Sequence, residues 1–252
     1  MSGHSKWSTI KRQKGVTDIK RGQTFTKLAN VITIAVKLGG SGDPDANSRL
    51  RMVMDEASSV NMPKDNMQRA IDRGLGKGGE QALEEVLYEG FGPGKAAFLV
   101  KGLTDNKMRT TQGIKNIFER NGGSLAGQGS VIYMFDRKGE IRVECKGGSS
   151  EDEMLELIDL GADDVEEFNE DNIQTYLVYV QSPELNTMSN KITQAGYSIK
   201  SQELIYKPST LMQINDKETA QKVIEFANKL EDLDDVQKVF ANFEIKEEIL
   251  EI

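Results

Sequence analysis

The chain has 252 residues, with 40 Asp and Glu against 32 Lys and Arg, one cysteine (Cys145) and one histidine (His4). This composition excludes a disulfide framework, a cysteine zinc cluster and a histidine-rich metal site within one chain, and we expect neither a metal nor a cofactor. The basic start lacks an apolar signal core, and the apolar run at residues 31–36 is too short to span a bilayer. We therefore expect a cytoplasmic protein with no membrane partner.

Positive charge is concentrated at the N-terminal end of this acidic chain. Residues 1–80 carry 14 Lys and Arg against eight Asp and Glu, and the first 38 residues carry eight basic residues against the single acid Asp18. A basic end on an otherwise acidic protein is typical of a surface that faces a polyanion. It indicates nucleic acid or a ribonucleoprotein as the partner.

We assign the nucleic-acid contacts to the polar arm at residues 1–20 and to the helix that follows it. Lysine and arginine would neutralise phosphates, while an indole or imidazole would stack on bases or supply polar contacts. For Trp7 the alternative, which we favour, is that the ring packs on the helices. The candidate contacts are His4, Lys6, Trp7, Lys11, Arg12, Lys14, Lys20, Arg21 and Lys27.

The rest of the first domain is predicted to be helical. Apolar residues recur at three- and four-residue steps from Phe25 to Val36, which predicts a helix that leaves Lys20 and Lys27 on the opposite face, free for a partner. A Gly- and Pro-containing break at residues 39–44 is followed by helices at about 46–60 and 63–74.

Two features of the third helix and its end have alternative interpretations. Arg69 and Arg73 either extend the basic surface or pair within the helix with Asp65 and Asp72, and we favour pairing. The glycine-rich stretch at residues 74–79 superficially matches a dinucleotide-binding loop. Because a helix rather than a strand precedes it, we interpret it as a hinge between domains.

From residue 83 the pattern changes to that of strands. Strands are predicted at residues 86–91, 96–100 and 130–135, with a helix at about 107–120 between the second and the third. The glycine-rich loop at residues 121–129 either places backbone N–H groups around an anion or is a plain connection that needs positive φ angles. The sequence leaves both interpretations open.

Residues 141–205 read as strand, helix, strand, strand, helix, strand, which is the ferredoxin-like βαββαβ unit. The tail that follows is too small to bury a core, so we join it to residues 81–135. The predicted fold class is α+β with three domains. Their bounds are residues 1–80 for a basic helical domain, 81–135 with 206–252 for a discontinuous α+β domain, and 136–205 for an inserted, acidic ferredoxin-like domain.

Neither catalysis nor metal binding is supported by the pattern of titratable residues. Acidic pairs between residues 163 and 171 lack the ligand rhythm of a metal loop, so we interpret them as a solvated strand edge or a protein contact face. With one histidine and one cysteine, a catalytic triad would depend on His4 in the arm. We expect no enzymatic activity and no small-molecule substrate.

Short motifs cover the first two-thirds of the chain in order. They are MSGHSKW at residues 1–7, KRG at 20–22, FTKL at 25–28, LGG at 38–40, DP at 43–44, NMPKDN at 61–66, RAI at 69–71, YEG at 88–90, GPG at 92–94, LTDN at 103–106, RT at 109–110, GSV at 129–131 and Phe135. With these motifs the chain resembles the YebC/PmpR family.

The resemblance implies a helical domain and two α+β domains, one inserted in the other, in a cytoplasmic regulator that is not an enzyme. Bacterial members of that family are described as DNA-binding transcriptional regulators. Others, including a mitochondrial relative, act in translation at the ribosome, with a role at proline-rich stalls. We therefore expect a DNA-binding transcriptional regulator; the alternatives are a ribosome-associated translation factor and a protein-interaction scaffold that uses the acidic domain.

Overall fold

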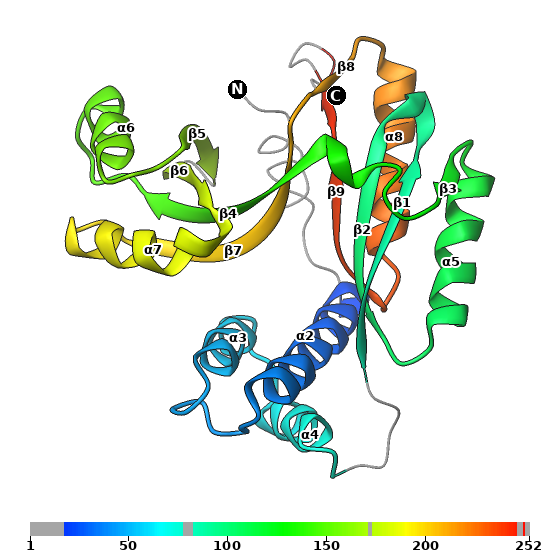
Figure 1. The fold of residues 1–252 in the computed structure, drawn as a ribbon, viewed down its shortest axis with the longest axis horizontal. Helices are drawn as coiled ribbons and strands as arrows, with labels where there is room; N and C mark the ends of the chain where they lie inside the picture. The colour runs from blue at the N-terminus through cyan, green and yellow to red at the C-terminus, as the bar shows by residue number, and fades with distance from the viewer. Residues whose placement is uncertain (1–17, 78–82, 171–172, 246–248, 250–252) are drawn as a thin grey trace.

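Three groups of elements make up the computed structural model, which describes residues 18–77, 83–170, 173–245 and residue 249 (Figure 1). Helices α2–α4 lie together at the bottom of the view. One sheet lies at the upper right with α5 and α8, and a second sheet lies at the left with α6 and α7. The predicted α+β class is confirmed.

The helices begin where the sequence supplies caps or breaks. Asn47 and Asn106 cap α3 and α5, and Asp216 caps α8, each by accepting a hydrogen bond from the backbone three residues on. The helices are α2 (Asp18–Gly39), α3 (Ser48–Ser59), α4 (Lys64–Gly74), α5 (Lys107–Arg120), α6 (Ser150–Asp159), α7 (Leu185–Gln194) and α8 (Lys217–Glu231). All seven of these helices of the described residues were predicted. Helix α2 begins seven residues before the predicted start at Phe25, and the other ends differ by a few residues.

Helices α2, α3 and α4 share one apolar core, in which Ile32 and Leu50 are fully buried. The periodic apolar face predicted for α2 points into this core. Gly74 is the last residue of α4. A Cβ at this position would lie only 2.6 Å from the Cβ of Val36, so the close approach of α4 to α2 requires glycine here.

The first sheet, sheet A, has the strand order β3-β1-β2-β9, and all of its pairings are antiparallel. Helices α5 and α8 cover one face, where Phe226 makes edge-to-face contacts of 4.9 Å with Phe98 and Phe118. The strands are β1 (Glu84–Phe91), β2 (Ala97–Thr104), β3 (Ser124–Ala126) and β9 (Val236–Ala241); a separate parallel pair joins β8 (Met212–Ile214) to β10 (Phe243–Ile245).

The second sheet, sheet B, has the order β5-β6-β4-β7 and is wholly antiparallel. Its elements follow one another in the predicted βαββαβ order. Helices α6 and α7 pack on one face, where Leu157 of α6 joins Ile141 and Val178 of the sheet in one apolar core. The strands are β4 (Phe135–Glu144), β5 (Asp164–Glu170), β6 (Ile173–Gln181) and β7 (Ile199–Pro208).

The two sheets pack against each other through the faces that their helices leave open. Ala97, Leu99 and Phe240 of sheet A meet Leu177, Tyr179 and Ile205 of sheet B in a buried apolar cluster, which also contains Val131 and Phe135. We call these eight residues the inter-sheet cluster. It fixes the orientation of the two sheets relative to each other.

The strand predicted at residues 130–135 is wrong. A 3-10 turn spans Ile132–Met134, and β4 begins only at Phe135. The carboxylate of Glu89 accepts the N–H groups of Val131 and Ile132, so these two donors are not available to a strand ladder. The short strand β3, in contrast, lies where the sequence predicts only a loop.

Candidate nucleic-acid interface

Most of the predicted nucleic-acid contacts fall on parts of the chain that the structure does not describe. Lys20 and Arg21 lie at the start of α2, and their side chains are outside the described part. Lys27 is described in full. Outside the described residues altogether are His4, Lys6, Trp7, Lys11, Arg12 and Lys14.

Lys27 holds α2 against the end of α8. Its ammonium group donates to the carbonyl of Glu231, and Gln23 donates to the carbonyl of Asp232 at 3.1 Å. The last carbonyls of a helix lack intrahelical partners and lie at the negative end of its dipole, so cations and amide donors stabilise them. The expectation that Lys27 is left free for a partner is therefore wrong, because the C-terminal end of α8 meets that side of α2.

Other cations of the helices are also bound to the body of the protein. Lys37 donates to the carbonyl of Leu83 at 3.1 Å, and Arg49 pairs with Glu85 at 3.4 Å. Each contact joins α2 or α3 to the start of sheet A. These groups form a polar joint between the helices and the sheet, and we call it the helix–sheet joint.

Arg69 and Arg73, for which pairing inside α4 was favoured, behave differently from each other. Arg69 stays on its own helix, donating to the carbonyl of Asp65 at 3.3 Å and to the side chain of Asn66. Arg73 reaches across to Asp105 at the end of β2, with an N–O distance of 3.7 Å. For Arg73 the prediction of a partner within the helix missed this contact, and its guanidinium belongs to the helix–sheet joint.

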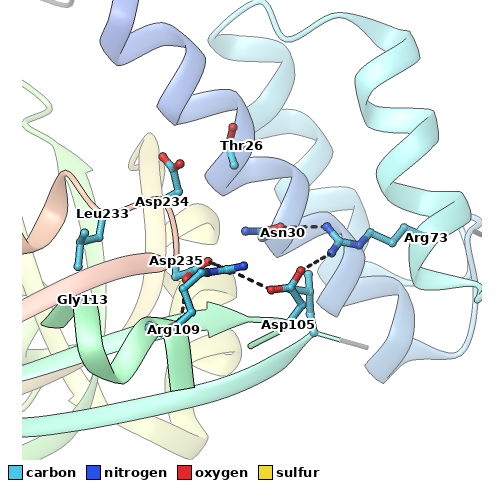
Figure 2. Close-up of a pocket in the computed structure, with 11 residues that line it drawn as sticks. Thr26, Asn30, Arg73, Asp105, Arg109, Gly113, Leu233, Asp234 and Asp235 are labelled. Carbon is cyan, nitrogen blue, oxygen red and sulfur yellow. Dashed lines mark hydrogen bonds and ion pairs between the residues drawn. The ribbon is translucent and has the colours of Figure 1, made fainter. Parts of the chain in front are cut away.

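A cavity of about 480 Å³ lies inside this joint, between α2, the start of α5 and the turn before β9 (Figure 2). Figure 2 shows a chain of polar contacts along it. Asn30 accepts a hydrogen bond from Arg73, Arg73 pairs with Asp105, and Asp105 also pairs with Arg109 at 2.9 Å.

Asp235 ends this chain of contacts. It receives two hydrogen bonds from Arg109, at 3.0 and 3.1 Å, and one of 2.7 Å from the hydroxyl of Thr110. The hydrogen bonds from Arg109 to Asp235 raise the pKa of that guanidinium above its ordinary value. Since both carboxylates face guanidinium groups, the cavity is suited to holding α4, β2, α5 and the turn before β9 together rather than to acid–base chemistry.

Two of the short sequence motifs, to which no role was assigned above, build this cavity. Asp105 belongs to LTDN, and Arg109 and Thr110 form RT. Asn106 is the last residue of LTDN, and its side chain caps α5 by accepting the N–H of Arg109. The side chains of Arg109 and Thr110, in the first turn of α5, then reach Asp235. The motifs were the available signal, but the partner lies 126 residues away in sequence.

The alternatives for the glycine-rich loop at residues 121–129 are resolved in part by Glu89. This buried carboxylate accepts N–H groups from Gly129, Val131 and Ile132 at 2.7, 2.6 and 2.8 Å. Burial alone would raise the pKa of Glu89, but the three backbone donors together hold it below its ordinary value. The anion at the end of this loop is therefore one of the protein's own side chains.

The same arrangement occurs before α6. Glu153 accepts the N–H groups of Lys146 and Gly148 at 3.0 and 2.7 Å. Here too burial opposes ionisation, yet the backbone donors lower the pKa of the carboxyl. Donors of both glycine-rich turns are thus satisfied internally, which leaves these N–H groups unavailable to a phosphate.

Three acidic residues of the stretch at 163–171 pair within sheet B. Asp163 accepts from Lys138 at 2.8 Å, and Lys207 pairs with Asp164 and Glu166 at 2.7 and 3.0 Å. Among the described residues, no group of three or more His, Cys, Asp or Glu side chains is placed to hold a metal ion. The ion pairs explain this local excess of acid as part of the packing of sheet B.

Comparison with known proteins identifies the family. Residues 5–77 match the family model described as the TACO1/YebC protein N-terminal domain, and residues 83–243 match the TACO1/YebC second and third domain. The chain belongs to the TACO1/YebC family. The resemblance drawn from the sequence motifs is confirmed.

Relatives in the TACO1/YebC family match along their whole length. A protein of Chloroflexus aurantiacus named "Probable transcriptional regulatory protein" is 47% identical, covering 99% of this chain and 98% of the relative. A protein of the same name from Aquifex aeolicus is 43% identical over 100% and 99%. The crystal structure of a conserved hypothetical protein from Aquifex aeolicus, 42% identical, superposes with a TM-score of 0.85 over 98% of this chain and 100% of that one.

Helices of the described part of this TACO1/YebC protein give no sign of a membrane span. None of them combines the length with the apolar character needed to cross a bilayer.

Proposed function

We propose that the protein is a cytoplasmic, nucleic-acid-binding regulator without enzymatic activity, and specifically a DNA-binding transcriptional regulator. The observation that carries this proposal is the segregation of charge, with eight basic residues and one acid among the first 38 residues of a chain whose net charge is −8. A strongly basic segment on an acidic protein attracts a polyanion while the remainder prevents non-specific adhesion. The printed names of the relatives support a role in transcription.

The contacts of α2–α4 support different roles for the helices and for the arm that precedes them. Three described cations of α2 and α4, namely Lys27, Lys37 and Arg73, are bound to carbonyls and a carboxylate of the protein itself. Phosphate contacts then fall to the arm, with Lys6, Lys11, Arg12 and Lys14 as its cations. In this proposal the helical domain (residues 1–80) positions the arm, and the other two domains (81–135 with 206–252, and 136–205) hold it in place.

A second candidate is a translation factor that binds ribosomal RNA. The observation that favours it is on α3, where Arg49 and Arg51 pair with Glu85 and Asp45 and are not presented as base-reading side chains. Sequence-specific readout of DNA normally requires side chains directed at base edges from an element that fits the major groove. An arm that contacts phosphates suits structured RNA as well as duplex DNA.

Crosslinking in cells, with sequencing of both DNA and RNA at two salt concentrations, tests the proposal. Promoter peaks that persist at the higher salt support the transcriptional regulator, whereas ribosomal RNA enriched at one position supports the second candidate. Reversing the charges at Lys11, Arg12 and Lys14 should weaken binding at least roughly tenfold and reduce the salt dependence by about one unit of slope for each phosphate that the arm no longer neutralises.

The matched control carries the same charge change on open surface, as Lys95→Glu, Arg120→Glu and Lys217→Glu. It should bind as the wild type does. If the arm variant also binds normally, the arm is not the nucleic-acid contact and this proposal is wrong.

A further inference from the structure

A second cleft, of about 200 Å³, lies where sheet A faces sheet B on the side of α3. Leu87 of β1 and Lys101 of β2 form one wall. Arg137 of β4 and Leu204 of β7 form the other. The cleft adjoins the inter-sheet cluster, against which Leu87 itself packs, so its base is apolar while its walls carry charge.

The two cations of this cleft differ from lysines at neighbouring strand positions in lacking a partner. In the described structure neither the Lys101 ammonium nor the Arg137 guanidinium has a hydrogen bond or an ion pair. The neighbouring cations do: Lys238, which lies opposite Lys101 on β9, pairs with Glu203, and Lys207 pairs with two carboxylates. Acidic side chains are therefore available in this region but are directed elsewhere.

The cleft carries more positive charge than its own carboxylate balances. Lys101 is half-buried and Arg137 is exposed, and Lys238, which lies opposite Lys101, is already paired with Glu203. The acid that lines the cleft, Glu85, pairs with Arg49 of α3. Walls of low dielectric strengthen the attraction of the remaining positive charge for an anion that enters.

We propose that this cleft binds the phosphate of one nucleotide unit, with Lys101 and Arg137 as its ligands. A guanidinium matches two phosphate oxygens with a planar pair of donors, and an ammonium adds a point charge. Leu204, which is 42% exposed, and Tyr206 offer apolar and aromatic surface to the sugar or base beside that phosphate. A cleft of this size between two sheets admits a single strand or a free nucleotide and excludes a duplex.

The inference deepens the proposed function and rests on it, because it adds a single-strand contact to a protein whose arm is proposed to hold nucleic acid. It predicts two separable contributions. The arm contributes to binding of both duplex and single strand, whereas the cleft contributes to binding of the single strand alone.

Fluorescence anisotropy with a labelled 12-nucleotide RNA and with the corresponding duplex separates these contributions. The double variant Lys101→Gln with Arg137→Gln should weaken single-strand binding about tenfold and lower its salt slope by roughly 0.7 for one phosphate released. Duplex binding should stay unchanged. Since neither side chain has a partner to lose, the thermal midpoint should stay within about 2 °C of the wild type.

Two further variants make the test specific. Arg120→Gln with Lys217→Gln removes the same charge from open surface and should bind as the wild type does. Lys101→Arg with Arg137→Lys keeps the charge in the cleft and should retain most of the single-strand affinity. A titration with adenosine monophosphate, followed by calorimetry, shows whether a free nucleotide is the ligand: binding that disappears in the glutamine variant would support the cleft with that source.

Three outcomes overturn the inference, and they are distinguishable. A wild-type protein that binds neither duplex nor single strand overturns the proposed function along with the cleft. Single-strand binding that is unchanged in the cleft variant, with no binding of the mononucleotide, overturns the cleft alone. Equal losses in the cleft variant and the surface control reduce the effect to net charge and also overturn it.

Discussion

Two interfaces of this protein differ in the kind of contact that forms them: one is apolar, and the other is largely polar. Where sheet A meets sheet B, the inter-sheet cluster of eight buried residues fills the contact, including the rings of Tyr179 and Phe240. Where the helices meet sheet A, three buried apolar residues, Ile34, Leu83 and Leu103, are surrounded by lysine, arginine and carboxylate contacts. Apolar burial is insensitive to salt, whereas exposed ion pairs are screened by it.

This difference indicates that the two sheets move as one rigid body and that helices α2–α4 are attached to them less firmly. The two sheets should keep their orientation under any condition in which the protein is folded. The helix–sheet joint depends on contacts that are each worth little, because they are partly exposed, so it should loosen before either sheet unfolds. The arm that we propose to bind nucleic acid precedes α2 in the chain, and α2 meets the sheets through the weaker of the two interfaces.

The largest effect is expected from Phe240→Ala in the inter-sheet cluster. The ring is fully buried and packs edge-to-face on Tyr206 at 5.4 Å, so its removal leaves a cavity between the sheets. We expect the free energy of unfolding in urea to fall by about 3–5 kcal/mol. Tyr133→Ala, at a ring that is 73% exposed, is the control and should cost less than about 0.5 kcal/mol. Equal losses for the two would mean that the cluster does not hold the sheets.

An intermediate effect is expected from Glu89→Gln, which replaces the carboxylate that accepts the N–H of Val131, a residue of the same cluster. The amide brings a donor toward three backbone N–H groups, and we expect a loss of about 2 kcal/mol at pH 7. Folding lowers the pKa of Glu89 from its ordinary value of 4.5. The ionised carboxylate therefore stabilises the protein fully at pH values above 4.5, and this stabilisation is lost as the pH falls through the lower pKa of the folded state.

Urea unfolding at pH 7 and pH 3 measures this contribution. The wild type should lose more stability on acidification than Glu89→Gln does, because the variant has no carboxylate at this position to protonate. The difference between the two proteins isolates Glu89 from the other acids, which titrate in both. Identical pH profiles would show that the carboxylate is not needed to order the turn.

The smallest effect is expected in the helix–sheet joint. A double-mutant cycle of Arg73→Ala and Asp105→Ala should give a coupling of at most about 1 kcal/mol, which vanishes in 1 M salt, because both groups are partly exposed. The pair Arg51 and Asp45, which lies farther out in solvent, is the control and should show almost no coupling. A large, salt-independent coupling at Arg73 would make the joint as permanent as the sheets.

Local patterns predicted most of the fold. The apolar steps of α2, the break at residues 39–44 and the alternation of strands and helices in sheet B are properties of neighbouring residues, so the sequence contains them. The turn at Ile132–Met134 was missed because its geometry depends on Glu89, whose carboxylate binds from more than 40 residues away. Long-range hydrogen bonds of single side chains leave no periodic trace.

The candidate site was predicted less well for the same reason. Charge counting located the basic end, but it could not show that Lys27 binds the end of a helix 204 residues later. Nor could it show that Arg73 and Arg109 share Asp105, or that Lys101 and Arg137 line one cleft. Each of these contacts joins segments that only the fold brings together.

The ribbon formed by β4 and β7 is a lever that carries helices α6 and α7. The chain enters sheet B at Phe135 and leaves it at Pro208, and these two residues lie opposite each other at one end of the ribbon. Ten residues of strand at about 3.3 Å each extend roughly 33 Å, so a tilt of about 5° at the base moves the far end by about 3 Å. Helices α6 and α7 are mounted on this lever, so the rigidity of the inter-sheet cluster at its base sets how precisely these two helices are positioned.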